Sequence, residues 1–186
     1  LTLQVQPGEH YTSNGLQITP QLNYNGVLNV NIVVTDGIDS SAPFAMKYNV
    51  SAVNDAPVVN AIETDSLNFE VGSDFVNITS LFDIQDVDDD SLERAEIGFR
   101  RLNHESGADL LSFAGTTNIS GVFDRQAGIL VLNGKAPLAA YALAVRAIQY
   151  KYETQGQAQL STKSIYITLN DGKTFSDSKD RYIQLT

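Results

Sequence analysis

The chain has 186 residues, of which 42% are hydrophobic and 18% are charged, and its formal net charge is −10 at pH 7. This composition predicts a globular, folded protein. The acidic excess argues against nucleic acids and anionic membranes as partners. The sequence contains no cysteine, which excludes disulfides and thiol chemistry. No apolar run approaches the roughly 20 residues that a membrane-spanning helix needs.

The first third of the chain predicts four strands joined by glycine-containing turns. Apolar and polar residues alternate in each predicted strand, as expected when one face of a sheet is buried. Pairs such as Asn-Gly and Asp-Gly favour tight turns, because glycine tolerates a positive φ angle. We place strands at residues 1–5, 11–19, 27–34 and 44–53, with Asn14-Gly15 as a turn inside the second and Asp36-Gly37 before the fourth.

The rest of the chain predicts an all-β module with one short helix. Pro137 fits the first position of a helix over residues 137–144, which are rich in alanine. Tyr141 and Val145 are four residues apart and would share its buried face. Residues 83–90, 104–109 and 153–159 are predicted loops. Strands are predicted at residues 58–59, 67–71, 75–78, 96–99, 111–113, 121–123, 129–132, 148–152, 164–169 and 182–185.

An internal repeat divides the chain. The stretch Val33-Val34-Thr35-Asp36-Gly37 returns as Ile167-Thr168-Leu169-Asn170-Asp171-Gly172, with serines after both. Between them Val53-Asn54-Asp55-Ala56-Pro57 has the composition of a junction. We therefore predict two modules of one kind, residues 1–56 and residues 57–186.

The first module is expected to be the C-terminal part of a sandwich, because four strands are few for this architecture. Leu1 does not begin a signal peptide, so we expect the chain to be part of a longer one. Strand edges left open in residues 1–53 would invite pairing with another chain.

The loop Asp86-Val87-Asp88-Asp89-Asp90 is the best candidate for a metal site. Carboxylates that are crowded in a loop repel one another, and Ca²⁺ prefers six to eight oxygen ligands. An EF-hand loop is excluded, since the required glycine and glutamate are absent. A solvated acidic loop remains the alternative.

Topology predicts which residues would join this loop. If residues 165–170 and 182–185 form the last hairpin, its Asp171-Gly172 turn lies at the end of the module where Pro57 enters. A strand that ends at Ile84 would deliver the acidic loop to the same end. The predicted Ca²⁺ ligands are therefore Asn54, Asp55, Asp86, Asp88 and Asp171.

These motifs resemble a known family. Val34-Thr35-Asp36-Gly37 and Asn54-Asp55-Ala56-Pro57 look like the end of a cadherin-like tandem repeat from large bacterial surface adhesins. Residues 84–183 resemble the related repeat of such adhesins and of animal proteoglycan and matrix core proteins. The resemblance implies secreted or cell-surface β-sandwich modules in series, with Ca²⁺ at their junctions. It also implies that Glu70 serves the next junction at the opposite end.

The resulting hypothesis is a structural or adhesion module without catalysis, whose partners are neighbouring repeats of the same chain and surface ligands such as glycans or another adhesin. The rival is a carbohydrate-binding module, for which the tyrosines at 24, 141, 150 and 152 would supply a stacking platform; core packing is the other role open to them. An enzyme ranks third. The candidate catalytic residues are His104 and Glu105, which are adjacent in a loop and expected at the surface, and a glycosidase-like carboxylate pair among Glu63, Asp65 and Glu105.

Overall fold

The computed structural model describes residues 1–101, 104–153 and 161–186. It divides into two compact units, unit 1 (Leu1–Val53) and unit 2 (Asn54–Thr186). Unit 2 begins at Asn54, whereas the sequence placed the boundary after residue 56. Both units are built of strands, as predicted, and the described residues contain a single α-helix. Most of the predicted loop at 153–159 lies outside the described residues.

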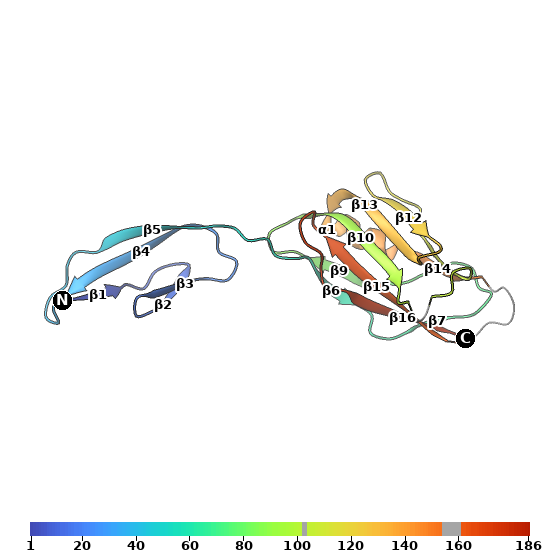
Figure 1. The fold of residues 1–186 in the computed structure, drawn as a ribbon, viewed down its shortest axis with the longest axis horizontal. Coiled ribbons are helices and arrows are strands. Elements are labelled where there is room, and N and C mark those ends of the chain that lie inside the picture. Colours follow the sequence, from blue (N-terminus) through green and yellow to red (C-terminus); the bar gives the residue numbers. More distant parts are fainter. Residues whose placement is uncertain (102–103, 154–160) are drawn as a thin grey trace. The chain divides into compact units, whose positions relative to one another are not determined.

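Unit 1 contains a three-stranded antiparallel sheet and a hairpin (Figure 1). The sheet has the order β1-β4-β5, with β1 spanning Thr2–Val5, β4 Gly26–Thr35 and β5 Phe44–Val50. The hairpin joins β2 (Tyr11–Asn14) to β3 (Gln17–Pro20), and its turn places Gly15 at φ 61°. The core of this unit is small, because only Tyr11, Leu28 and Val30 form its buried cluster.

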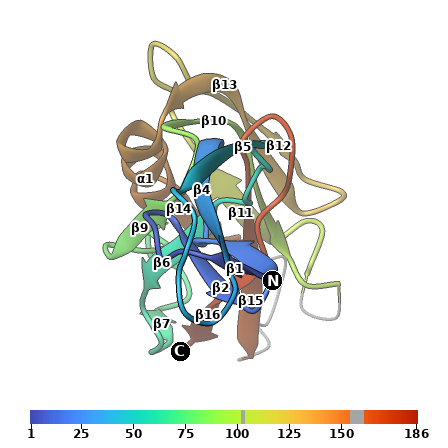
Figure 2. The ribbon, with the colours of Figure 1, turned by 90° about the vertical axis from the view of Figure 1, so that its left-hand side faces the viewer.

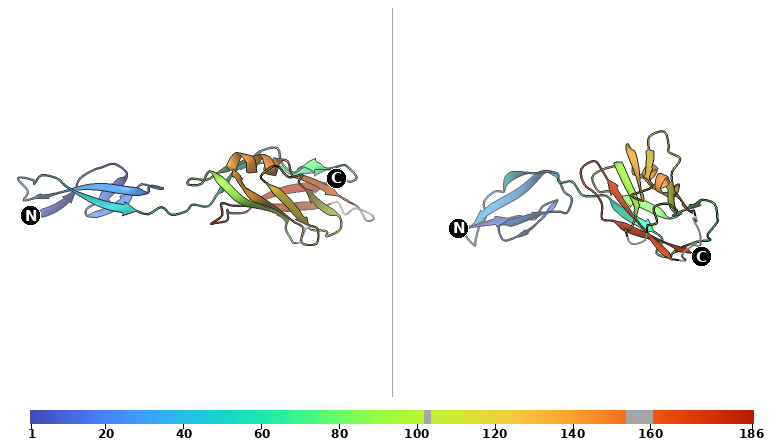
Figure 3. Two further views of the ribbon diagram at one scale, coloured as in Figure 1. Left: turned by 90° about the horizontal axis from the view of Figure 1, so that it is seen from above. Right: turned by 45° about the vertical axis from the view of Figure 1, so that its right-hand side comes forward.

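Unit 2 is a β-sandwich built around one large sheet of order β12-β13-β10-β15-β16-β7 (Figures 1 and 3). A three-stranded sheet, β11-β14-β8, and a two-stranded sheet, β6-β9, accompany it. The bounds are β6 Val58–Ile62, β7 Leu67–Phe69, β8 Val76–Asn77, β9 Phe82–Gln85, β10 Ser91–Phe99, β11 Asp109–Ser112, β12 Ser120–Asp124, β13 Ile129–Pro137, β14 Gln149–Tyr152, β15 Thr162–Asn170 and β16 Lys179–Leu185.

The helix α1 (Leu138–Arg146) lies beside β9 and packs against β10 and β13 (Figure 2). Tyr141 and Val145 are fully buried, as the four-residue spacing predicted. Pro137 is not the first helical residue, however. It ends β13 and precedes the helix with an extended backbone, φ −56° and ψ 153°. A proline has no N–H to contribute in either position, so the composition does not distinguish them.

Two further expectations can be compared with unit 2: the Asp83 loop prediction was wrong, and the core-packing role considered for the tyrosines at 141, 150 and 152 is confirmed. Asp83 was expected in a loop, but it lies on β9. Strand alternation turns its carboxylate outward, where it accepts a hydrogen bond from the Asn60 side chain at 3.0 Å. Tyr141, Tyr150 and Tyr152 are core residues with at most 4% exposure, so they offer no sugar-stacking platform.

The internal repeat holds at the level of single hydrogen bonds. Residues 32 and 167 occupy corresponding positions 135 apart, and their partners across the last hairpin, Phe44 and Lys179, are also 135 apart. Asp36 Oδ1 accepts the N–H groups of the residues two and three positions later, at 2.9 and 2.8 Å. Asp171 Oδ1 does the same at 2.6 Å in both cases. The following glycines have φ angles of 97° and 98°, which an L side chain rarely adopts.

Candidate metal site

Three segments of unit 2 meet at one end of the sandwich. They are the residues where the chain enters the unit, the acidic loop after β9 and the turn after β15. Hydrogen bonds join them: the side chain of Asn54 bonds Asp171, and the backbone of Asp55 bonds Asp88. These hydrogen bonds confirm the prediction that the three segments lie close together. All the residues involved belong to unit 2.

Asp171 is the buried member of the cluster, with 5% exposure. Its Oδ1 accepts the backbone N–H groups of Lys173 and Thr174, both at 2.6 Å, and this fixes the turn. Its Oδ2 accepts the side-chain amide of Asn54 at 2.7 Å. Burial alone would raise the pKa of this carboxyl, but the hydrogen bonds from Asn54 and the two backbone groups lower it below its usual range. Asp171 is thus held as a carboxylate.

The two carboxylate oxygens of Asp86 also have different surroundings. Oδ1 accepts the backbone N–H groups of Asp88 and Asp89, both at 3.2 Å, so it shapes the acidic loop. Oδ2 is buried and has no hydrogen-bond partner among the described residues. Burial raises the pKa of the Asp86 carboxyl, and the nearby carboxylate of Asp88 raises it further, while the two backbone bonds oppose the rise. A cation bound beside this carboxyl would instead lower its pKa.

Asn54 supplies the second unpartnered oxygen. Its amide nitrogen donates to Asp171 Oδ2 at 2.7 Å and to the carbonyl of Asp55 at 2.8 Å. The direction of these donations assigns Oδ1 as the free acceptor, and that atom is buried without a partner among the described residues. Carboxylate oxygens of Asp86, Asp89 and Asp171 all lie within 4.8 Å of one another.

The structure modifies the predicted ligand set in two places. Asp55 and Asp88 meet through the backbone N–H of Asp55, which lies 3.3 and 3.4 Å from the two Asp88 oxygens. Both side chains are exposed and stand outside the group of converging carboxylates. Asp89, which the sequence prediction omitted, belongs to that group. It pairs with Lys173 Nζ at 2.8 Å, a contact that raises the pKa of the lysine.

The donor chemistry of the cluster fits a hard cation with oxygen ligands. Carboxylates and an amide oxygen are the groups that Ca²⁺ takes in proteins, and its coordination is flexible enough for an irregular set. Mg²⁺ demands near-octahedral geometry and keeps its waters, so it suits this site less well. Zn²⁺ favours nitrogen and sulfur ligands, and none of the clustered residues provides one.

Glu70 lies at the other end of β16 from the Asp171 turn. It follows β7, whose last residue accepts the backbone N–H of Thr186 at 2.9 Å. Its side chain is exposed. The prediction that Glu70 serves the opposite end of the module agrees with this position but is not tested by it.

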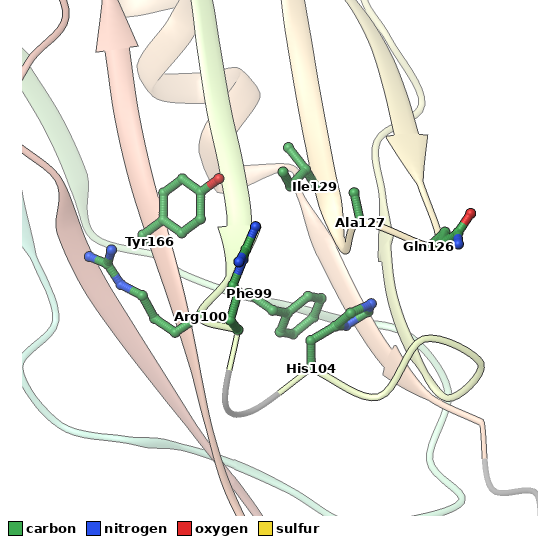
Figure 4. Close-up of a pocket in the computed structure, with 8 residues that line it drawn as sticks. Phe99, Arg100, His104, Gln126, Ala127, Ile129 and Tyr166 are labelled. Carbon is green, nitrogen blue, oxygen red and sulfur yellow. The ribbon is translucent and has the colours of Figure 1, made fainter.

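A hollow of about 600 Å³ in unit 2 is lined in part by aromatic and cationic side chains (Figure 4). The Tyr166 ring lies against Gly98, where an added Cβ would come within 2.6 Å of it, and the Arg100 guanidinium lies 5.0 Å from its centre. The Phe99 ring is stacked on His104 at 5.2 Å. These rings are engaged within the protein, which weighs against a sugar-stacking surface here.

The residues considered for catalysis have structural partners. The His104 side chain is only 9% exposed, so the expected surface position was wrong; it packs where Gly128 leaves room for its ring. Glu105 bonds Tyr152 at 2.7 Å and Lys163 at 2.6 Å. Glu63 accepts the N–H groups of Ser80 and Leu81 at 2.8 and 3.0 Å. The glycosidase-like pair therefore has no support from these contacts.

No protein-family model matches the chain, and no curated protein sequence matches it either. Among the described residues, no helix is both long and apolar enough to cross a membrane. The cadherin-like resemblance thus stays a hypothesis from the motifs.

Proposed function

We propose that unit 2 binds a calcium ion at the cluster of Asn54, Asp86, Asp89 and Asp171. The observation that carries this proposal is the pair of buried, unpartnered oxygens, Asn54 Oδ1 and Asp86 Oδ2, beside converging carboxylates. A buried acceptor without a partner costs free energy, and so does the close approach of like charges. One cation would remove both costs.

The hydrogen bonds that hold the two aspartate side chains in place support the same proposal. Asp86 and Asp171 each use Oδ1 to hold the backbone of their own loop. The side chains are therefore fixed before a cation arrives, and binding requires little further ordering. Pre-organised ligands bind more tightly because less conformational entropy is lost. Water would complete the six to eight oxygens that Ca²⁺ takes.

The biological role we propose is structural: a module of a long secreted or cell-surface protein, in which bound calcium stiffens a tandem array. Asn54 is the first residue of unit 2, so an ion that holds it limits the directions available to the preceding chain. Units joined by a few residues otherwise move relative to one another. The acidic composition and the cadherin-like motifs agree with this role, and adhesion to glycans or to another adhesin would be its purpose.

The direct test is calorimetric titration of the 186-residue chain with CaCl₂, and with MgCl₂ for comparison. We expect calcium binding with a Kd of about 10⁻⁴–10⁻³ M, the range of extracellular modules, and weaker magnesium binding. Asp171→Asn keeps the oxygen that holds the turn but removes the charge, and should weaken binding about tenfold or more. The double change Asp86→Ala with Asp88→Ala should abolish it.

The repeat supplies a matched control. Asp36→Asn makes the same change in the equivalent turn of unit 1, where Asp36 is exposed and outside the group of converging carboxylates. It should leave calcium binding unchanged. If Asp36→Asn and Asp171→Asn weaken binding equally, the effect belongs to the turns and not to a site. If calcium produces no heat and no thermal shift, the proposal fails and the carbohydrate-binding alternative takes precedence.

A further inference from the structure

Two strands of unit 2 carry a charged side chain at a position whose neighbours are apolar. The inward-facing positions of β15 are residues 163, 165, 167 and 169, and the last three are Ile165, Ile167 and Leu169, each 0% exposed. The first is Lys163, whose side chain is only 2% exposed. It is the only buried lysine in the described residues. On β11 the first buried residue is Asp109, which is 0% exposed.

The side chains of Lys163 and Asp109 meet inside the sandwich. Lys163 Nζ lies 3.2 Å from Asp109 Oδ2, and His104 Nδ1 lies 3.7 Å from the same oxygen. Because β15 belongs to the six-stranded sheet and β11 to the three-stranded sheet, the lysine contact joins the two sheets. Burial penalises both charges, and proton transfer from Nζ to Oδ2 removes them. The result is a neutral amine in contact with a neutral carboxylic acid, which are the reactants of amide formation.

Glu105 places a base beside the amine. Its Oε1 lies 2.6 Å from Lys163 Nζ, and its Oε2 accepts the Tyr152 hydroxyl at 2.7 Å. Hydrogen bonds from Lys163 and Tyr152 lower the pKa of Glu105, so this side chain is a carboxylate. Its backbone N–H donates to Asp109 Oδ2 at 2.7 Å and fixes that carboxyl against the amine. A carboxylate within hydrogen-bond reach of a proton can act as a general base.

Tyr150 binds the other oxygen of Asp109. Its hydroxyl donates to Oδ1 at 2.8 Å, and the side chain is 0% exposed. Burial raises the pKa of Tyr150 and the charge of Asp109 raises it further, so the hydroxyl keeps its proton. A donor aimed at the oxygen on which negative charge develops stabilises a tetrahedral intermediate. The rings of Phe69 and Phe99 lie 5.0 and 6.0 Å from the Tyr150 ring and shield the group from water.

We propose that Lys163 and Asp109 form an intramolecular amide bond, with Glu105 as the catalytic base. One Nζ proton passes to Asp109 Oδ2, and the neutral amine attacks Cγ to form the C–N bond. Glu105 takes a second proton from Nζ and returns it to Oδ2, which leaves as water when its C–O bond breaks. Nζ keeps its third hydrogen as the amide N–H. Oδ1 becomes the amide oxygen, and Glu105 is again a carboxylate.

The fold supplies what this condensation needs. In water an amine and a carboxyl group of these types are both charged and do not condense, whereas well-oriented groups reach effective concentrations of about 10⁵–10⁸ M. The bond would tie β11 to β15, so the two sheets could not separate at this point without breaking a covalent bond. Such a cross-link suits a module that carries load. The inference does not depend on calcium, because no residue of the proposed calcium site takes part.

The test is the intact mass of the purified, folded 186-residue chain, measured after denaturation. We expect a mass that is lower than the sequence mass by one water molecule. Trypsin should not cleave after Lys163, and the digest should contain a branched peptide that joins residues 109 and 163. Lys173 is the internal control: its Nζ lies 2.8 Å from Asp89 Oδ2, a shorter contact, but its side chain is 57% exposed. Trypsin should cleave after Lys173 normally.

Two variants separate the roles of the residues. Glu105→Gln keeps the size of the side chain but cannot carry a proton, so this variant should fold and retain the full sequence mass. Lys163→Met removes the nucleophile and should also retain the full mass. The loss of a covalent cross-link gives the unfolded chain more freedom, so unit 2 of Glu105→Gln should have a lower Tm than unit 2 of the native chain.

The measurement on the native chain decides the proposal without any variant. If the folded native chain has the full sequence mass and is cleaved after Lys163, the three side chains form an ion pair only and the proposal fails. It also fails if the lost water belongs to a peptide that does not join residues 109 and 163. If Glu105→Gln loses water as completely as the native chain, Glu105 is not the base.

Discussion

At the scale of single residues, the carboxylates of unit 2 differ in what their hydrogen bonds leave free. Both carboxylate oxygens of Glu63 accept hydrogen bonds from one loop, from the Thr79 hydroxyl and from the N–H groups of Ser80 and Leu81. Asp86 keeps one buried oxygen without a partner. A fully bonded carboxylate stabilises the fold, whereas a carboxylate with a free buried oxygen is available to a ligand. The sequence alone does not distinguish a carboxylate that stabilises the fold from one that is available to a ligand.

Glu63 should make stability depend on pH in acid. Burial alone would raise its pKa, but the hydrogen bonds from Thr79, Ser80 and Leu81 lower it from 4.5 to about 2. A lowered pKa in the folded state gives stability that is complete above about pH 4.5 and is lost as pH falls towards 2. Relative to Glu63→Gln, which does not titrate, the native chain should lose about 3 kcal/mol of unfolding free energy between pH 6 and pH 2.

Urea unfolding of both chains across this range measures the difference, because the other titrating groups cancel in the comparison. A difference that is constant from pH 6 to pH 2 would show that Glu63 is not held in its charged form.

At the scale of elements, α1 is positioned by tertiary contacts. Pro137 precedes it without a side-chain cap, and the first turn has no acidic residue. The helix is short for independent stability, so its packing face must hold it. Tyr141 is the main anchor: it is fully buried, and its hydroxyl donates to the carbonyl of Gly134 at 2.7 Å. Burial, with a smaller contribution from Glu93, raises the pKa of this tyrosine to about 12.

Removing that hydroxyl should therefore destabilise unit 2. Tyr141→Phe leaves the Gly134 carbonyl without its partner, and we expect a loss of about 1–2 kcal/mol in unfolding free energy. Tyr182→Phe is the control, since Tyr182 is 43% exposed and its hydroxyl forms no hydrogen bond in the described part of the chain. It should change stability by less than about 0.5 kcal/mol. Equal effects from the two changes would contradict the anchoring role.

The elements were largely predictable from the sequence, but side-chain contacts were not. Alternation and Asp-Gly pairs are local signals, and they located β4, β5, β15 and β16. The participation of Asp89 depends on the path of a loop that holds four aspartates in five positions, and spacing alone does not say which carboxylates turn inward. His104 was misplaced for a related reason: its burial depends on Gly128, 24 residues later, which leaves room for the ring.

At the scale of the whole molecule, the two units have separate cores of very different size. The cluster in unit 1 is centred on Tyr11, Leu28 and Val30, and no residue of the cluster in unit 2 belongs to it. Units of fewer than about 70 residues rarely draw more than about 3–5 kcal/mol from a single core. Unit 1 should consequently be the less stable of the two.

We expect two transitions in differential scanning calorimetry, with unit 1 unfolding first. Calcium should move only the second, because every residue of the proposed site belongs to unit 2. A ligand that binds only the folded state at 100 times its Kd adds about 2.7 kcal/mol, which corresponds to a rise of roughly 10 °C in Tm for a domain of this size. Chelator should reverse the shift, and Asp171→Asn should remove it. A calcium-dependent shift of the first transition would place a binding site in unit 1, and a single transition that shifts as a whole would show that the units do not unfold independently.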